Sequence, residues 1–127
     1  MSQRQVIATN GAPKAIGPYS QAIRANGFIF VSGQTPIDPA TQQLIAGTIG
    51  EQTGRVLHNI EAILQQAGSS MAKIVRCGVF LKDMNDFVAM NEVYAKFFPA
   101  DPPARSTIQA ARLPKDCQVE IDAIALE

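Results

Sequence analysis

The stretch from Pro103 to Glu127, PARSTIQAARLPKDCQVEIDAIALE, decides the fold of this chain. It predicts two short strands separated by a turn at residues 113–116, LPKD. Residues 118–126 alternate between two faces, which is the period-two pattern of a β-strand. The first strand carries Arg105 and the second carries Glu120. We expect these charges to be the working pair of an active site, with Arg105 holding a small carboxylate and Glu120 handling a proton or orienting a water.

The surroundings of Glu120 leave a second interpretation open. Ile124 and Leu126 share its face of the strand, so neither face is fully polar. A carboxylate on a partly apolar face lies at a rim or is buried with a partner; desolvation raises its pKa, and a nearby cation lowers it. The pattern alone is equally consistent with a structural ion pair or a solvated strand edge.

The length and composition of the chain limit the classes of protein to consider. With 127 residues it is expected to form one domain, residues 1–127, that is long enough for a hydrophobic core. The residues are 46% hydrophobic and 17% charged, which indicates a globular chain. Lys plus Arg and Asp plus Glu each number 11, whereas a dedicated nucleic-acid binder carries a basic surplus, so we expect no nucleic-acid partner.

Targeting and metal-binding signals are missing from the sequence. The first residues, MSQRQVIAT, contain no apolar signal region, and no apolar run approaches the length of a membrane span. Cys77 and Cys117 lack C-x-x-C spacing, so we expect reduced thiols and a cytoplasmic protein without a membrane partner. The single histidine, His58, is expected at the surface, and scattered carboxylates do not make a ligand set, so no metal is expected.

Turn signals divide the first third of the chain into short strands. A Gly- and Pro-rich loop over residues 10–18 is stiffened immediately before Tyr19, which either occupies a defined place in a site or covers the edge of the core. Asn26-Gly27 predicts a tight hairpin, and Gly33 permits close backbone approach. Strands are expected at residues 6–7, 20–25 and 28–32, followed by a long loop at 36–47.

Two amphipathic helices are expected in the rest of the chain. Thr48-x-x-Glu51 resembles a capping box and opens the first, whose apolar residues lie on one face up to the Gly68 stop: Val56, Leu57, Ile60, Ile63, Leu64 and Ala67. A strand at residues 73–81 is expected to place Val75, Cys77, Val79 and Leu81 on one face. Asp83 is the expected N-cap of the second helix, whose buried side carries Phe87, Met90, Tyr94 and Phe97 before the stop at Pro99. Asn91 lies near this stripe and either points at a cleft or is solvated.

The predicted elements do not bury all of their apolar surface within one chain. Two helices cover only one face of a sheet, and the strand patterns leave apolar residues for the other face. Because no further segment remains to cover that face, we expect self-association, driven by removal of apolar surface from water.

Several motifs together resemble the RidA (YjgF) family of small enamine and imine deaminases. They are APKAIGPYSQ at 12–21, VSGQ at 31–34, FLKDMNDF at 80–87, PARS at 103–106, ARLPKD at 111–116 and VEIDAIA at 119–125. The resemblance covers nearly the whole chain. It implies an α+β, chorismate-mutase-like fold, a mixed sheet with two helices on one face. It also implies a homotrimer with the open sheet faces packed in a central barrel and active sites in the clefts between subunits.

The resemblance also implies residue roles and a reaction. Arg105 matches the carboxylate-binding arginine and Glu120 the glutamate that handles a proton or water; the other matching pocket residues are Tyr19, Ser32, Gly33 and Asn91. Thr107 stands where relatives often have cysteine, so a thiol nucleophile is excluded there, while a backbone N–H contact to substrate is retained. The loop at 99–102 is shorter than in some relatives, which affects the cleft rim. The implied reaction is hydrolysis of 2-aminoacrylate or 2-iminobutanoate to 2-oxo acids and ammonia, which removes damaging metabolites, without cofactor or metal.

A different class of function is kept as an alternative. The same Arg105 cleft would serve a non-catalytic trimer that senses a 2-oxo acid, or a chaperone-like or translation-affecting protein. A ribonuclease would require a basic surface, which the balanced charge does not favour. The sequence does not identify the preferred imine, a partner enzyme, or a role for Cys77 and Cys117 beyond packing.

Overall fold

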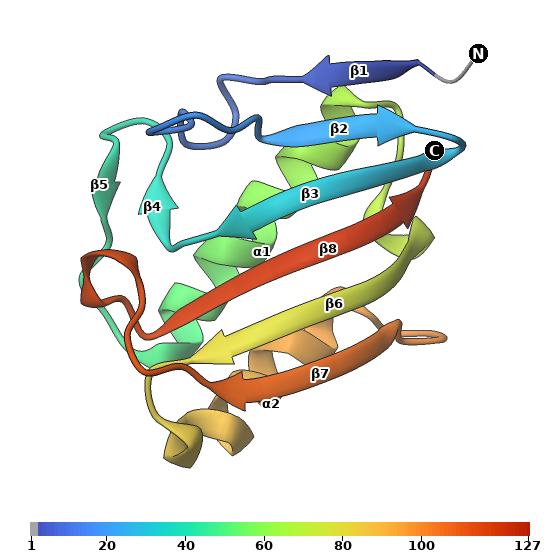
Figure 1. The fold of residues 1–127 in the computed structure, drawn as a ribbon. Coiled ribbons are helices and arrows are strands. Elements are labelled where there is room, and N and C mark those ends of the chain that lie inside the picture. The colour runs from blue at the N-terminus through green and yellow to red at the C-terminus, as the bar shows by residue number, and fades with distance from the viewer. Residues whose placement is uncertain (1–2) are drawn as a thin grey trace.

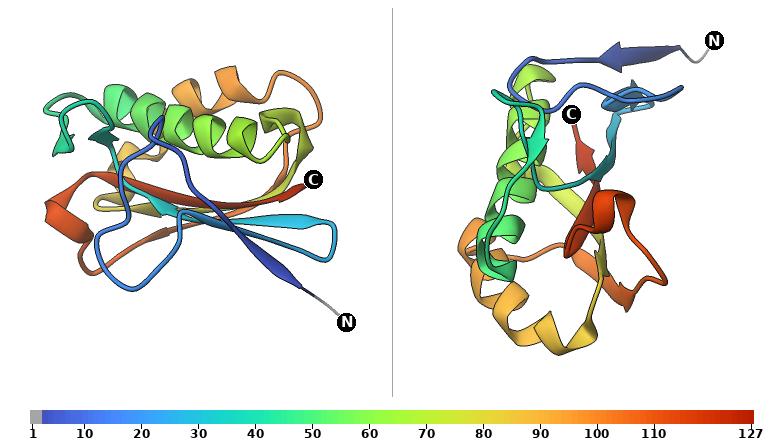
Figure 2. Two further views of the ribbon diagram at one scale, coloured as in Figure 1. Left: turned by 90° about the horizontal axis from the view of Figure 1, so that it is seen from above. Right: turned by 90° about the vertical axis from the view of Figure 1, so that its left-hand side faces the viewer.

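In the computed structural model, which describes residues 3–127, two helices cover one face of a six-stranded mixed sheet (Figures 1 and 2). The sheet contains β1 (Arg4–Ile7), β2 (Ala22–Ala25), β3 (Phe28–Gln34), β6 (Ile74–Leu81), β7 (Ala104–Gln109) and β8 (Val119–Leu126). The helices are α1 (Ile49–Gln66) and α2 (Phe87–Phe97). A small two-stranded sheet, β4 (Ile37–Asp38) and β5 (Gln43–Leu44), and three 3₁₀ turns, η1 (Met71–Lys73), η2 (Met84–Asp86) and η3 (Pro114–Asp116), complete the fold. The predicted α+β class with both helices on one face is confirmed.

The strand order separates the two strands of the C-terminal stretch. The order is β1-β2-β3-β8-β6-β7, so β6 lies between β7 and β8. It pairs parallel with β7, where Cys77 is opposite Arg105, and antiparallel with β8, where Phe80 is opposite Glu120. The turn at 113–116 therefore connects strands that are not neighbours, and Arg105 and Glu120 do not face each other across a ladder.

The core between the sheet and the helices follows the predicted helical stripe. The five apolar side chains of this stripe from Val56 to Leu64 are fully buried, and Ala67 at the helix end is 6% exposed. Gly68 has a positive φ of 82°, the left-handed conformation that ends many helices. Asn26 and Gly27 have φ values of 53° and 85°, as the predicted tight hairpin requires. Periodic and turn signals in the sequence are thus confirmed here.

The first turn of α1 is closed by the predicted capping box. Glu51 N–H donates to Thr48 Oγ1 at 3.2 Å, and Thr48 N–H donates to Glu51 Oε1 at 3.0 Å. We expect Thr48→Ala to lower the free energy of unfolding by about 1 kcal/mol, because the backbone N–H of Glu51 loses its acceptor. Urea unfolding measures this change. Ser70→Ala is the matched control, since Ser70 precedes η1 and makes no capping hydrogen bond with its side chain; an equal loss in both variants would contradict the assignment.

Two predictions about β6 and α2 are wrong in detail. The register of β6 shifts between Ile74 and Arg76, a bulge that turns Ile74 into the core and leaves Val75 39% exposed. Val75 therefore does not share a face with Cys77. Asp83 does not cap α2; it accepts a hydrogen bond from Asn85 N–H and caps η2, a 3₁₀ turn inserted before the helix.

Smaller differences concern element boundaries and one side chain. β2 begins at Ala22 rather than at residue 20, and the expected loop at 36–47 contains the β4–β5 hairpin. In α2, Met90 and Tyr94 are buried as predicted, but Phe87 is 37% exposed. His58 is exposed, as predicted. Cys77 and Cys117 are free thiols in the core.

The sheet face opposite the helices carries exposed apolar side chains. Val6, Phe30, Ile108 and Leu126 are each between 44% and 56% exposed. Figure 2 shows both helices on the other side of the sheet. The strand patterns thus leave apolar residues on the open face, as the sequence predicts. In the described part of the chain, none of the helices combines the length and apolar character needed to cross a membrane.

Candidate functional site

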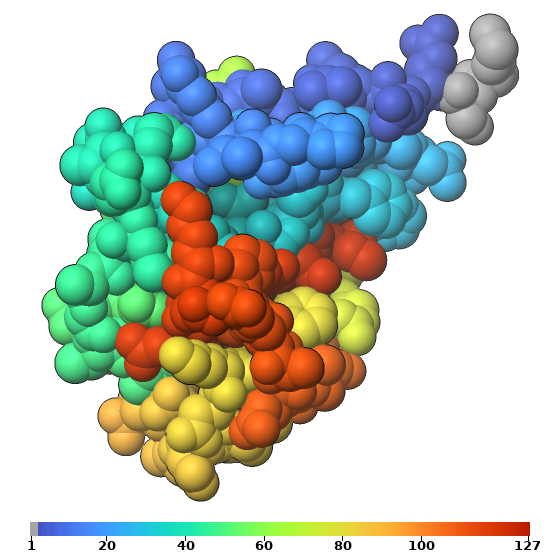
Figure 3. Space-filling view, turned by 60° about the vertical axis from the view of Figure 1, so that its left-hand side comes forward, coloured from blue at the N-terminus to red at the C-terminus, as the bar shows by residue number. Residues whose placement is uncertain are grey.

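Glu120 lies in a hollow on the open side of the sheet. Its neighbours Val119 and Ile121 are fully buried toward the helices, so the intervening side chain points the other way. The hollow measures about 390 Å³ and is lined by Ile16, Tyr19, Gly33, Thr35, Ile37, Pro114, Lys115 and Glu120. We call it the Glu120 pocket. The η3 loop, the β4–β5 hairpin and the loop before β2 gather around it on the face shown in Figure 3.

A bulge in β3 brings Gly33 directly against the Glu120 side chain. The pairing of β3 with β8 shifts between Val31 and Gln34, so Ser32 and Gly33 lie in an irregular part of the ladder. A Cβ built on Gly33 would overlap Glu120 Oε2 and lie 2.9 Å from its Cδ. Only glycine leaves room for the carboxylate here, and the bulge leaves backbone of β3 unpaired in the ladder beside it.

Gly33→Ala is therefore expected to displace the Glu120 carboxylate and to destabilise the protein by about 1–3 kcal/mol through overpacking. Chemical denaturation measures the loss. Gly27→Ala is the comparison, because nothing lies within 4 Å of the Cβ built there and any loss comes from its positive φ of 85° instead. An unchanged free energy of unfolding in Gly33→Ala would contradict the role of this close approach.

The carboxyl group of Glu120 has a raised pKa. Burial desolvates the charged form, and the nearby Asp122 carboxylate adds like-charge repulsion. Asp122 itself accepts a hydrogen bond from Gly78 N–H at 2.9 Å on the same face. A half-buried carboxyl of raised pKa in a hollow is suited to proton transfer or to orienting a water.

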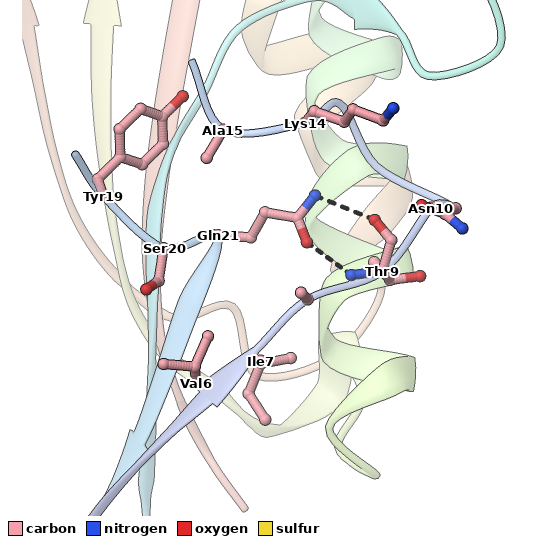
Figure 4. A pocket seen from close by; sticks show the side chains of 10 residues that line it. Val6, Ile7, Thr9, Asn10, Lys14, Ala15, Tyr19, Ser20 and Gln21 are labelled. Atoms are coloured by element: carbon pink, nitrogen blue, oxygen red, sulfur yellow. Dashed lines mark hydrogen bonds between the residues drawn. The ribbon is translucent and has the colours of Figure 1, made fainter. Parts of the chain in front are cut away.

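The loop that carries Tyr19 is anchored by local and distant hydrogen bonds. Tyr19 N–H donates to Gly17 O at 2.9 Å, and Tyr19 Oη accepts from Ile16 N–H at 3.3 Å. The buried Gln21 accepts from Thr9 N–H and donates to backbone oxygens of the same loop (Figure 4). Tyr19 lines both the Glu120 pocket and a second hollow of about 330 Å³ beside Gln21. The loop thus holds the half-exposed ring of Tyr19 in one place.

Ser32 is fixed by backbone contacts rather than by the Glu120 pocket itself. Its hydroxyl donates to Ser20 O at 2.6 Å, and its N–H donates to Gln21 O at 2.9 Å. These bonds tie the β3 bulge to the loop that carries Tyr19. Three of the residues predicted for the site, Tyr19, Gly33 and Glu120, are therefore brought together, with Ser32 next to them.

Arg105 lies on the other face of the sheet, between β7 and α2. Its Nη1 donates to Asn91 Oδ1 at 2.8 Å. Its guanidinium carbon is 4.7 Å from the centre of the Tyr94 ring and 5.6 Å from that of Phe87, within the range of cation–π interactions. Thr107, two residues along β7, lies on the same side, and its Oγ1 is buried without a hydrogen-bond partner in residues 3–127.

No carboxylate neutralises Arg105 within the described residues. The ion pairs found in residues 3–127 are His58–Glu61 and Arg112–Asp116, both exposed. Structural arginines are commonly paired when they are partly buried. A partly buried guanidinium held only by an amide and two rings is instead available to an anionic ligand.

The predicted pair is thus divided between two half-sites. Arg105 and Asn91 lie on the helix face, while Glu120, Tyr19 and Gly33 lie on the open face. Within residues 3–127 of one chain, no acidic side chain pairs with Arg105. The one cationic side chain among the described residues that line the Glu120 pocket is Lys115. If Arg105 and Glu120 act on one molecule, they must come from different copies of the chain.

Some residues around the half-sites were not predicted from sequence. Phe87 and Tyr94 were interpreted only as the buried stripe of a helix, and nothing in their spacing separates that role from contact with Arg105. Lys115 was placed in a turn; its φ of 55° within LPKD is visible only in the structure. Among residues 3–127, no group of three or more His, Cys, Asp or Glu side chains is arranged to hold a metal ion.

Comparison with known proteins gives the family. A family model described as Endoribonuclease L-PSP matches residues 9–127. The chain belongs to this family. RutC family protein PH0854 of Pyrococcus horikoshii is 54% identical over 122 residues, which are 96% of this chain and 97% of that protein. The 2-iminobutanoate/2-iminopropanoate deaminase of Capra hircus is 46% identical over 98% of this chain and 90% of its own length.

A solved structure links the fold to the same family. The Yersinia pestis protein YyfA, described as a protein of unknown function of the conserved Rid family, superposes with a TM-score of 0.96 at 46% identity. The match covers 98% of this chain and all of that one. The predicted membership of the RidA (YjgF) family is confirmed, and the two-helix mixed sheet is the fold of its Rid relatives.

Proposed function

We propose that this protein hydrolyses reactive enamines and imines of small 2-oxo acids, such as 2-aminoacrylate and 2-iminobutanoate, to the 2-oxo acid and ammonia. The observation that carries the proposal is the uncompensated Arg105 guanidinium. It is rigidly held, partly buried and free of any acid in residues 3–127. A guanidinium of this kind binds a carboxylate through two parallel hydrogen bonds.

The proposal includes a homotrimer whose open sheet faces pack together in a central barrel. Two features support it: the exposed apolar side chains of that face, and the separation of Arg105 from Glu120 within one chain. In such an assembly, Arg105 and Asn91 of one subunit face the Glu120 pocket of the next. Sedimentation equilibrium measures the assembly; a monomer with full activity would contradict an active site shared between subunits.

The chemistry requires positioning more than activation. Arg105 holds the carboxylate, which fixes the C=N carbon near Glu120. One water adds to that carbon while Glu120 orients it or takes its proton, giving a carbinolamine. Glu120 passes the proton from water to nitrogen. The hydroxyl proton of the carbinolamine then also moves to nitrogen as the C–N bond breaks, so ammonia leaves and the carbonyl of the 2-oxo acid forms. Tyr19, the Ser32–Gly33 backbone and the Thr107 N–H complete the pocket. No step requires a metal or cofactor.

The test is ammonia release by the purified protein from freshly generated 2-iminobutanoate or 2-aminoacrylate. We expect hydrolysis faster than the spontaneous rate and a bound 2-oxo acid product. A protein that binds 2-oxobutanoate saturably without accelerating hydrolysis would instead be a 2-oxo-acid sensor. Because relatives carry the description Endoribonuclease L-PSP, RNA cleavage is measured in parallel; activity that survives Arg105→Ala would identify a different site.

A further inference from the structure

The residues around the Arg105 guanidinium form a three-sided support on α2. Phe87, Asn91 and Tyr94 follow one another at spacings of four and three residues, which places them on one face of the helix. Asn91 fixes Nη1, the buried Tyr94 ring lies 4.7 Å from the guanidinium carbon, and the half-exposed Phe87 ring lies 5.6 Å away. We call this set the Arg105 cradle.

We propose that Phe87 and Tyr94 are positioning residues, which hold the Arg105 guanidinium in the orientation that accepts the substrate carboxylate. This inference rests on the proposed function and adds two aromatic residues to the site. Both have the geometry of a structural helix stripe, but the guanidinium also lies over both rings, and this cation has no acid partner in the described chain.

Contacts around Arg105 restrict its conformational freedom. An arginine side chain has many rotamers, and a freely moving one would lose this rotamer entropy on binding a ligand. Contacts that fix the guanidinium beforehand remove that loss from the binding step. Asn91 alone fixes one nitrogen, whereas contact with the two rings also restricts the orientation of the guanidinium plane.

The groups that contact the Arg105 guanidinium are electrically neutral. Burial raises the pKa of the Tyr94 phenol, and it also raises the pKa of the neighbouring Cys77 thiol. Both groups therefore stay neutral at physiological pH. With a neutral amide and two neutral rings around it, Arg105 keeps its full positive charge for the ligand.

One edge of the guanidinium is left for the ligand. Nη1 donates to Asn91, whereas Nε and Nη2 make no well-formed hydrogen bond within residues 3–127. These two nitrogens form one side of the planar fork, and they match the two oxygens of a carboxylate. The cradle therefore directs a side-on, bidentate grip through Nε and Nη2.

Substitutions at Tyr94 distinguish contact by the ring from hydrogen bonding by the hydroxyl. Tyr94 Oη is buried beside Cys77 and Arg105 but makes no well-formed hydrogen bond in residues 3–127, whereas the ring lies 4.7 Å from the guanidinium carbon. Tyr94→Phe keeps the ring and removes the hydroxyl. Tyr94→Leu keeps an apolar side chain and removes the ring. The two variants give opposite expectations for the same position.

The experiment measures 2-oxobutanoate binding by calorimetry, imine turnover, and the order of the Arg105 Nε–H bond by ¹⁵N relaxation. For Tyr94→Leu we expect about tenfold weaker binding and about tenfold higher KM, with kcat changed less than about threefold. Tyr94→Phe restores binding to within about twofold. The Arg105 Nε–H is expected to be ordered in the wild type and in Tyr94→Phe, and mobile in Tyr94→Leu.

Controls make each outcome decisive. Phe97→Leu changes another aromatic of α2 that stacks against His58 rather than Arg105, and it should leave binding unchanged. Phe87→Leu, at the exposed rim, should weaken 2-oxobutanoate binding about threefold. This variant tests the inference if Tyr94→Leu does not fold. The inference would be overturned if the cradle variants kept wild-type binding of 2-oxobutanoate and an ordered Arg105 Nε–H bond. It would also be overturned if Phe97→Leu lost as much binding as they do. If the wild type shows no turnover, only the proposed deaminase activity is refuted. The role of the cradle is still tested, because the order of the Arg105 Nε–H bond is measured without substrate.

Discussion

Arg105→Ala is expected to reduce imine hydrolysis to the spontaneous rate, a loss of at least about 100-fold in kcat/KM. The variant removes the guanidinium of this half-site, and with it the two hydrogen bonds that would fix the substrate carboxylate. Alanine leaves Asn91 Oδ1 without its 2.8 Å hydrogen bond, but this oxygen belongs to a half-exposed side chain that water can reach. The fold should therefore remain intact, as melting and sedimentation can verify.

Two further variants isolate the cause of that loss. Arg105→Lys keeps the positive charge but lacks the planar fork, so an intermediate activity is expected. Arg55→Ala is the matched control, because Arg55 makes the same kind of hydrogen bond, to Asn59 Oδ1 at 3.1 Å, on α1. Turnover of Arg105→Ala above the no-protein background would refute a catalytic cleft built around this cation.

Local sequence signals predicted the elements of the fold well where they are periodic. The helical stripe from Val56 to Leu64, the capping box at Thr48 and the Asn26-Gly27 hairpin each depend on residues close in sequence. The strand order does not. That β6 lies between β7 and β8 depends on pairing between distant segments, and alternation within the C-terminal stretch carries no information about it.

The errors in β6 and α2 have similar physical causes. A bulge at Val75 inverts the faces of a strand, yet residues 74 and 75 are both β-branched and apolar, so either face is compatible with the pattern. Asp83 is followed by residues that fit an α-helix, and the inserted 3₁₀ turn still uses it as a cap. Such changes in local geometry are decided by tertiary packing rather than by residue type.

The candidate site was only partly accessible from the sequence. Arg105 and Glu120 stand out as charges within strands, and the family resemblance added Tyr19, Ser32, Gly33 and Asn91. Their roles stay predictions, but the structure groups them into two half-sites. The contacts of Phe87 and Tyr94 with Arg105 could not be predicted from the sequence. A buried helical stripe and a stripe that contacts a cation have identical spacing.

Glu120→Gln is expected to lower kcat by about 100-fold or more while 2-oxobutanoate still binds, since an amide cannot take a proton from water but leaves Arg105 untouched. The same variant should be more stable than the wild type at neutral pH. Burial and Asp122 raise the pKa of Glu120 in the folded state, so the charged form is disfavoured there. The relief of that cost should raise Tm.

The pH dependence of this stability difference follows from the direction of the pKa shift. A raised folded-state pKa means that protonated Glu120 favours folding, and this contribution is lost as pH rises through that pKa. The gain in Tm of Glu120→Gln over the wild type should therefore be small near about pH 4 and grow toward pH 7. A constant difference across this range, or full turnover by Glu120→Gln, would mean that Glu120 is not the desolvated acid–base group of the site.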